Sequence, residues 1–213
     1  MLLGAAATAA APAGAGCPAA DAPLHEVFVA ADRPEAWSAP PPADAARPGW
    51  RLDWITPAGD DAALAAAALP DAAERLARRP PPGADAGPQS PLSPGLRRAA
   101  RAAALAVRSG PAWQGYFALE LRLQRPGALP PGSRGWLALV EALPAGSEGS
   151  PQARTLVRGV AGPLPLAGTA PLTHLHALRW PEGARPARLQ ARAWVEGPDG
   201  RVLAMAGERC GSP

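Results

Sequence analysis

Several residue types are missing or scarce in this 213-residue chain. Lys and Asn do not occur, Ile occurs once, and all 21 basic residues are therefore Arg, whereas Ala makes up 53 residues. Because Ala, Pro, Gly and Arg share GC-rich codons, this bias indicates a GC-rich bacterial genome. The arginine content is then poor support for an anionic partner, and with a formal net charge of only +3 we expect no nucleic-acid binding.

The signatures of common enzyme classes are also absent. The chain contains no Gly-x-Ser-x-Gly, no phosphate-binding glycine loop, no His-Glu-x-x-His and no Cys-x-x-Cys. Asp53, Asp60 and Asp61 are candidates for acid–base chemistry, but the last two stand at an expected helix start, where capping accounts for them. The sequence therefore favours a non-catalytic protein and leaves enzymatic activity open.

No hydrophobic run is long enough to cross a membrane. Residues 1–16 are uncharged and rich in Ala and Gly, and the tripeptides at 11–13 and 13–15 both fit the small-x-small pattern of a signal peptidase site. We therefore expect a signal-peptide-like segment at 1–16, export to the periplasm or medium, and no transmembrane segment. The alternative is an alanine-rich tail.

The chain has two cysteines, Cys17 and Cys210. In an exported protein they are expected to form one disulfide that joins the two ends of the chain. Alternatively Cys17 carries a lipid anchor, although the preceding Gly14-Ala15-Gly16 lacks the usual aliphatic residue. A third interpretation makes Cys17 the free thiol of a residual oxidoreductase.

Secondary-structure patterns divide the chain into two parts. Residues 17–110 are expected to form an α/β half with strands at 24–30 and 50–55, proline-rich segments at 31–49 and 80–95, and helices at 59–79 and 96–110. Within 59–79, Pro70 is expected to split the helix or to start a second one with Asp71 in its first turn. Residues 111–213 hold six strand candidates, at 113–124, 135–143, 153–160, 172–180 and in a hairpin at 187–207. The sequence therefore predicts an α+β fold in which an α/β half precedes an antiparallel β domain.

Four arginines lie on the helix expected at 96–110, namely Arg97, Arg98, Arg101 and Arg108. Such a face meets anionic lipid or nucleic acid in some proteins. No aromatic residues interleave with these arginines, and we interpret them as a solvated face.

His174 and His176 form the most specific constellation. Alternation on a strand places both imidazoles on one face, roughly 6.5 Å apart along the backbone. Such a pair suits copper or zinc, with His25, Cys210 or an acidic residue as the third ligand that a site normally needs. The alternative is that both histidines occupy a solvent-facing side of the strand or lean against Trp180.

The segment that begins with Glu26-Val27-Phe28-Val29 resembles the start of a family of secreted bacterial thioredoxin-like proteins of unknown function. In that family a strand leads into Phe-Thr-Ser-x-Gly-Cys-Ser-Ser-Cys-Pro-Pro-Ala-Asp, and residues 41–44 here are Pro-Pro-Ala-Asp. Trp37 and Pro40 then occupy the two cysteine positions. The run Arg154-Thr155-Leu156-Val157-Arg158 is similar to a Gly-Arg-Thr-Leu…Val-Arg segment of the same family.

This resemblance implies a degenerate thioredoxin-like part whose redox loop has lost its chemistry. Thiol–disulfide exchange needs an attacking thiolate and a resolving partner, and Trp37 and Pro40 supply neither. We therefore expect an exported scaffold or binding protein for an envelope protein or ligand that the sequence does not identify. The alternatives are a periplasmic copper- or zinc-binding protein and a residual thiol oxidoreductase.

Overall fold

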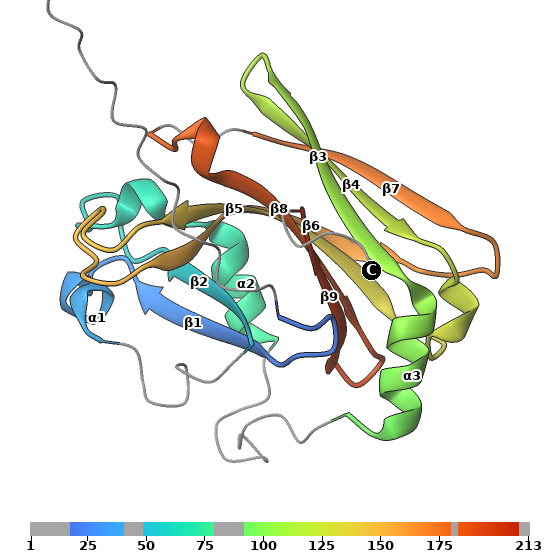
Figure 1. Cartoon of the computed structure of the whole chain (residues 1–213). Coiled ribbons are helices and arrows are strands. Elements are labelled where there is room, and N and C mark those ends of the chain that lie inside the picture. The colour runs from blue at the N-terminus through green and yellow to red at the C-terminus, as the bar shows by residue number, and fades with distance from the viewer. Residues whose placement is uncertain (1–17, 41–48, 79–91, 180–182, 209–213) are drawn as a thin grey trace, which may run out of the picture.

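The computed structural model describes residues 18–40, 49–78, 92–179 and 183–208 (Figure 1). In chain order its helices and strands are β1 (Leu24–Ala30), α1 (Pro34–Ser38), β2 (Trp50–Thr56), α2 (Pro70–Ala77), α3 (Pro94–Ala103), β3 (Leu105–Trp113), β4 (Tyr116–Leu123), β5 (Arg134–Leu143), β6 (Arg154–Pro165), β7 (Leu172–Arg179), β8 (Leu189–Glu196) and β9 (Val202–Gly207). Helices and strands are both present and strands predominate, in agreement with the expected α+β class.

The strands form two sheets. The larger has the order β1-β2-β6-β5-β8-β9, and the smaller has the order β3-β4-β7. β1 pairs in parallel with β2, β2 pairs in parallel with β6, and every other pairing is antiparallel. Strands from both sides of residue 110 therefore share the larger sheet, which joins the two parts of the chain through the β2–β6 pair.

The strands form where hydrophobic residues alternate with polar ones. On β4 the side chains of Leu119, Leu121 and Leu123 are buried, whereas Glu120 and Arg122 on the other face are half-exposed. The hairpin predicted at 187–207 is confirmed as β8 and β9, joined by a turn at residues 197–200. Period-two alternation identified β4, which has one face in a core, whereas β8 and β9 are buried on both faces and were identified with the turn between them.

The smaller sheet packs on one face of the larger sheet. Their shared core contains the buried leucines of β4 together with residues from β5 and β8, namely Leu137, Leu139, Ala191, Ala193 and Val195. Apolar side chains from two facing sheets give the arrangement of a β-sandwich over this part of the molecule.

The opposite face of the larger sheet is lined by tryptophans and covered by α2. Trp50, Trp54, Trp136 and Trp194 lie in one hydrophobic cluster with Ala72 of α2. The sheet curls around this cluster, so that residues before β1 meet the far edge: the Met205 N–H of β9 donates to the Ala20 carbonyl at 2.7 Å. The curl brings side chains of β1 and β8 within reach of the same helix.

The prediction of a helix at 96–110 was wrong for the second half of this segment. α3 ends at Ala103, Ala104 has a left-handed φ of 51°, and β3 begins at Leu105. Residues Leu105–Ser109 pair with Leu119–Leu123 of β4, and this pairing outweighs the helical propensity of an alanine- and arginine-rich run. Arg108 consequently lies on a strand, apart from the helical arginines.

In the segment expected to be helical at 59–79, the helix start predicted at Pro70 is confirmed, but the part before Pro70 is not α-helical. Only Pro70–Ala77 is α-helical, with a short 3₁₀ turn at Ala65–Ala67 before it. Leu69 is extended because the ring of Pro70 disfavours a helical residue before it. Asp60 and Asp61 therefore cap no helix. The loop expected at 31–49 contains α1, and its residues 41–48 lie outside the described ranges.

Within the described ranges, no helix is long and apolar enough to cross a membrane.

Candidate functional site

A buried arginine on α2 connects strands β1 and β8 of the larger sheet. Arg75 donates from Nε and Nη2 to the carboxylate of Glu26 on β1, at 2.9 and 3.0 Å, in a bidentate pair. Its Nη1 donates to Glu196 on β8. All three side chains are about nine-tenths buried. We call Arg75, Glu26, Glu196, Trp136 and Trp194 the arginine–tryptophan cluster.

The two tryptophans complete this cluster. The indole N–H groups of Trp136 and Trp194 donate to the two oxygens of Glu196 at 2.9 and 3.0 Å. Their rings are stacked, with centroids 5.8 Å apart, and the guanidinium carbon of Arg75 lies 5.5 Å from each centroid. The guanidinium therefore gains cation–π attraction in addition to its two ion pairs.

The electrostatics of the cluster favour a permanently charged arginine. Burial alone would lower the pKa of Arg75, but the carboxylates of Glu26 and Glu196 outweigh it, and the net pKa is raised. A raised pKa means that the folded state holds the proton more tightly than the unfolded state does. The stabilisation is thus complete below the unfolded-state pKa and is lost only as pH rises through the folded-state pKa, far above neutrality.

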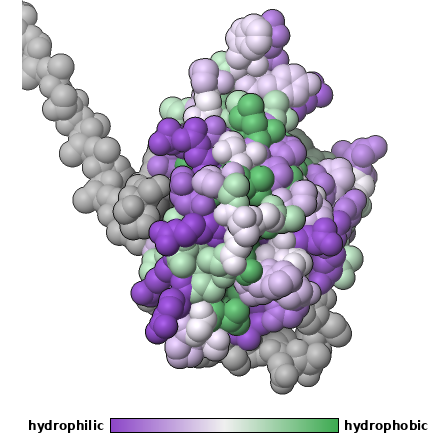
Figure 2. Space-filling view, turned by 90° about the vertical axis from the view of Figure 1, so that its right-hand side faces the viewer, coloured by the Kyte–Doolittle hydropathy of each residue, from purple (hydrophilic) through white to green (hydrophobic). Residues whose placement is uncertain are grey.

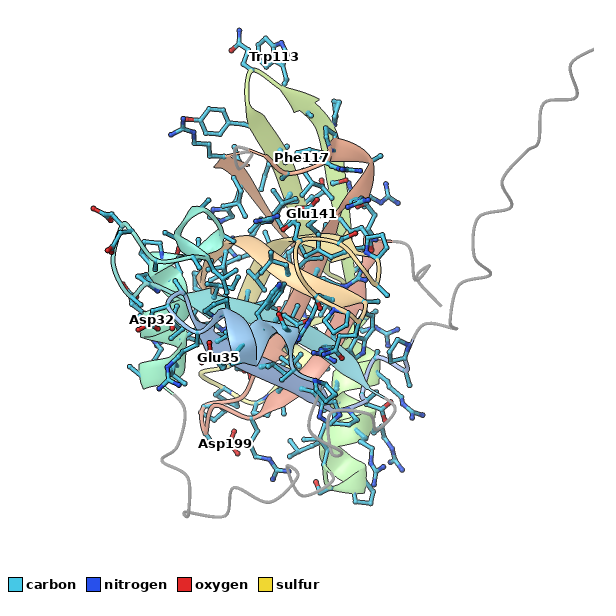
Figure 3. The ribbon with its side chains drawn as sticks, turned by 90° about the vertical axis from the view of Figure 1, so that its left-hand side faces the viewer. Asp32, Glu35, Trp113, Phe117, Glu141 and Asp199 are labelled. Atoms are coloured by element: carbon cyan, nitrogen blue, oxygen red, sulfur yellow. The ribbon has the colours of Figure 1, made fainter. Side chains whose placement is uncertain are left out.

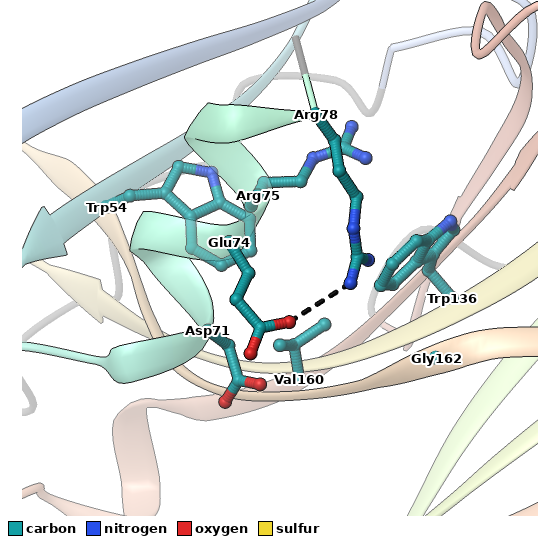
Figure 4. A pocket seen from close by; sticks show the side chains of 8 residues that line it. All are labelled: Trp54, Asp71, Glu74, Arg75, Arg78, Trp136, Val160 and Gly162. Carbon is teal, nitrogen blue, oxygen red and sulfur yellow. Dashed lines mark hydrogen bonds and ion pairs between the residues drawn. The ribbon is translucent and has the colours of Figure 1, made fainter.

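A small hollow opens beside the cluster (Figure 4). Its lining comprises Trp54, Asp71, Glu74, Arg75, Arg78, Trp136, Val160 and Gly162. Arg78 crosses the hollow to reach Glu74 at 3.0 Å and lies over the ring of Trp136. Gly162 is required here, since a Cβ at that position would lie 2.5 Å from the Trp136 ring. Glu74 and Arg78 pair with each other and Arg75 pairs with Glu26, whereas Asp71 contributes an exposed carboxylate to this lining.

Trp37, which the sequence resemblance predicted to occupy a cysteine position, is the centre of a second tryptophan site. It lies in the last turn of α1, is only 2% exposed, and packs with Val29, Leu143 and Leu156. Its indole N–H donates to the carbonyl of Glu148 at 2.9 Å. Pro40 follows the helix and is exposed.

Arg154 connects this site to the sheet. Its guanidinium carbon lies 4.5 Å from the Trp37 ring centroid, and its Nη2 donates to the Trp37 carbonyl. Its Nη1 donates to Asp53 of β2 at 3.2 Å, and both side chains are almost fully buried. Asp53 also accepts from Arg51 and from the Thr155 N–H, at 2.7 and 2.9 Å. Asp53 is therefore saturated with donors, which fits a structural role.

The histidine pair lies on β7, as the sequence predicted, with both rings on one face. His174 and His176 are half-buried, and their ring centroids are 6.4 Å apart. Nε2 of His174 lies 2.8 Å from the Pro165 carbonyl oxygen. His25 is on β1 in the other sheet. In the described part of the chain, no three His, Cys, Asp or Glu side chains are grouped as a metal site requires.

The remaining predicted site residues lie on α3 or outside the described ranges. Cys17 and Cys210 lie outside the described ranges, so their pairing stays a prediction. Arg97, Arg98 and Arg101 remain on α3, where Arg101 reaches Asp21 at 2.9 Å.

The chain matches no protein-family profile and no curated protein sequence. Its fold is similar to that of HBP35 of Porphyromonas gingivalis. The two structures superpose with a TM-score of 0.52 over 91% of this chain and 76% of that chain, at 10% sequence identity. At this identity the likeness concerns the fold alone.

The arginine–tryptophan cluster was missed by the sequence interpretation. Glu26, Arg75 and Glu196 are far apart in the chain, and nothing local marks them as partners. One signal was available: Arg75 follows Ala72 by three residues, on the helix face that is buried. An arginine on the apolar face of a short amphipathic helix predicts a buried carboxylate partner.

Proposed function

We propose that this protein is an exported, non-catalytic binding protein or scaffold whose N-terminal part is a redox-dead thioredoxin-like unit. The observation that carries the proposal is the environment of Trp37. The position that a cysteine nucleophile would occupy is filled by a buried indole, bonded to the Glu148 carbonyl and covered by Arg154. A side chain held in this way stabilises the loop and performs no thiol exchange.

The ion clusters also support a binding or structural role. Catalytic acids and bases need at least one poised, accessible titratable group. Glu196 accepts from three donors and Asp53 accepts from Arg51, Arg154 and a backbone N–H, so both carboxylates serve as acceptors within the protein. The partner expected for such a protein is an envelope protein or ligand.

Intact-mass measurement on the protein from its native host, before and after reduction, tests the export part. We expect loss of roughly 15 N-terminal residues and a gain of two hydrogens on reduction of a Cys17–Cys210 disulfide. A lipid adduct on Cys17 would make the protein membrane-anchored. An unprocessed chain with two free thiols would contradict export.

Insulin reduction tests the non-catalytic part. In a turbidity assay with dithiothreitol, the purified protein should not accelerate insulin precipitation above the uncatalysed rate. Acceleration that disappears in Cys17→Ser would establish the residual oxidoreductase instead.

A second candidate function is copper or zinc binding by β7. It is favoured by the contact between His174 Nε2 and the Pro165 carbonyl, because metal-binding imidazoles commonly donate their other N–H to a carbonyl oxygen. This contact leaves Nδ1 of His174 as the metal-binding nitrogen, beside a ring of His176 on the same face.

Calorimetric titration with Cu²⁺ and Zn²⁺ decides this candidate. Binding should be abolished or much weakened in His174→Ala, with His25→Ala as the matched control in the other sheet. Affinity weaker than about 1 mM, or affinity unchanged in His174→Ala, would remove the metal function.

A further inference from the structure

β7 is an open edge strand. All eight of its residues pair with β4 without a register shift, from Leu172↔Leu123 to Arg179↔Tyr116. Among the described strands no other pairs with β7, and in Figure 1 it forms the outer margin of the smaller sheet. Its second row of backbone N–H and C=O groups therefore faces outward.

This edge lacks the usual protection against strand addition. Natural edge strands are commonly short, contain a bulge or a proline, or carry charged side chains. β7 is regular, contains no proline, and carries one charged side chain, Arg179, at its end. Leu175, at its centre, is 68% exposed. Backbone geometry and side chains both leave the edge available to a partner strand.

The outer face of the smaller sheet is basic and partly apolar. Across the sheet, Arg108, Glu120 and Leu175 occupy one row, and Tyr116 and Arg179 occupy another. Glu120 is paired with Arg122 of the same strand at 3.2 Å. Arg108 and Arg179 have no carboxylate partner in the described part of the chain. Three arginines thus face one glutamate, and the excess positive charge is unpaired.

Apolar side chains are also exposed at the hairpin tip and along the side of the molecule that carries β7. Trp113 and Tyr116, at the tip of the β3–β4 hairpin, are 73% and 50% exposed. Figure 3 shows Trp113 projecting at the tip, away from the body of the protein, whereas Phe117 points inward. On the side of the molecule that carries β7, Figure 2 shows apolar residues along the middle of the face with hydrophilic residues on either side. Exposed aromatic residues beside unpaired arginines are typical of protein-binding surfaces.

We propose that β7 binds an extended, acidic segment of a partner protein, which adds to the smaller sheet as a fourth strand. The inference rests on the proposed binding function and assigns its partner class. Backbone hydrogen bonds to the open edge supply affinity, and side-chain alternation supplies specificity. Acidic side chains on one face of the added strand lie beside Arg179 and in the field of Arg108. The alternate side chains, which are apolar, lie beside the half-buried His174 and His176.

The first test measures binding of a fluorescein-labelled octapeptide, Glu-Val repeated four times, by anisotropy at low salt. The peptide matches the length of β7. Arg179→Glu should weaken its binding by about tenfold or more, because an attractive contact becomes repulsive, and Arg108→Glu should weaken it less. Arg98→Glu makes the same charge change on α3, outside this face, and should leave the affinity unchanged. A Lys-Val octapeptide should not bind.

Hydrogen exchange separates strand addition from general electrostatic attraction. With the Glu-Val peptide bound, amides of β7 should gain protection, whereas those of β1, the edge of the other sheet, should not. Equal binding of both peptides, equal loss in Arg98→Glu, or unchanged exchange in β7 would overturn the proposal. So would β7 protection that depends on protein concentration alone, since a second copy would then occupy the edge. None of these outcomes bears on thiol–disulfide exchange, which only the insulin assay measures.

Discussion

Arg75→Ala is expected to lower the free energy of unfolding by about 3–5 kcal/mol, because it leaves two buried carboxylates without their cation. Glu26 loses the bidentate donation from Arg75, and Glu196 keeps the indole N–H groups of Trp136 and Trp194. The helix also loses its connection to β1 and β8. Urea denaturation followed by far-UV circular dichroism measures the effect.

Arg78→Ala is the matched control for this prediction. Arg78 lies three residues further along the chain, its side chain is 48% exposed, and its i,i+4 pair with Glu74 is on the surface. Its loss should cost about 0–1 kcal/mol. If the two variants unfold at the same urea concentration, Arg75 does not hold the sheet and helix together.

A variant in which the two carboxylates are also neutralised separates the loss of the arginine's contacts from the cost of leaving charged carboxylates buried and unpaired. In Arg75→Met combined with Glu26→Gln and Glu196→Gln, no unpaired ion is buried, although the connection between helix and sheet is equally lost. We expect this triple variant to be more stable than Arg75→Ala, since uncompensated charge is the larger part of the penalty. A triple variant less stable than Arg75→Ala would show that stranded charge is not the larger part of the penalty.

Most strands were predictable because their own residues alternate between apolar and polar. Trp50, Leu52 and Trp54 alternate with polar neighbours, and the structure buries all three in one cluster. The error at 105–110 has the opposite cause. Leu105–Ser109 carries a helix-like composition, and only its pairing with β4 makes it a strand. Local sequence does not contain that information.

The way in which the sheets are assembled was not predictable for the same physical reason. β2 joins β6 through the register pair Asp53↔Leu156, between residues about a hundred positions apart. Asp53 was a candidate for acid–base chemistry in the sequence. In the structure it is the acceptor that orients Arg154 and the Thr155 N–H at this junction. The role of Asp53 as an acceptor follows from the pairing of β2 with β6, which patterns in a single sequence do not reveal.

The sequence singled out Trp37 only through a family resemblance, and its environment was not predicted. The resemblance to thioredoxin-like proteins placed it at a cysteine position. The structure adds that Arg154, from the second segment carrying that resemblance, lies against its ring. These two segments are thus in contact with each other, although 117 residues separate the Trp37 carbonyl from its guanidinium donor.

Trp37→Ala is expected to destabilise the protein by about 3–5 kcal/mol, the usual cost of removing a large buried aromatic side chain. The substitution removes the packing against Val29 and Leu156, the hydrogen bond to Glu148 and the ring beneath Arg154. Urea denaturation measures the loss. Trp113→Ala is the control, because its side chain is 73% exposed at the hairpin tip and should change stability by less than about 0.5 kcal/mol.

The comparison between these two tryptophans also bears on function. If Trp37 is a structural replacement for a lost nucleophile, its removal should reduce stability and leave binding of the Glu-Val peptide at β7 intact in the folded fraction. Trp113→Ala should leave stability intact and weaken binding of the peptide if the hairpin tip belongs to the binding face. A Trp37→Ala variant as stable as the parent protein would mean that the loop after β1 is not held by its indole, and the redox-dead interpretation would lose its physical basis.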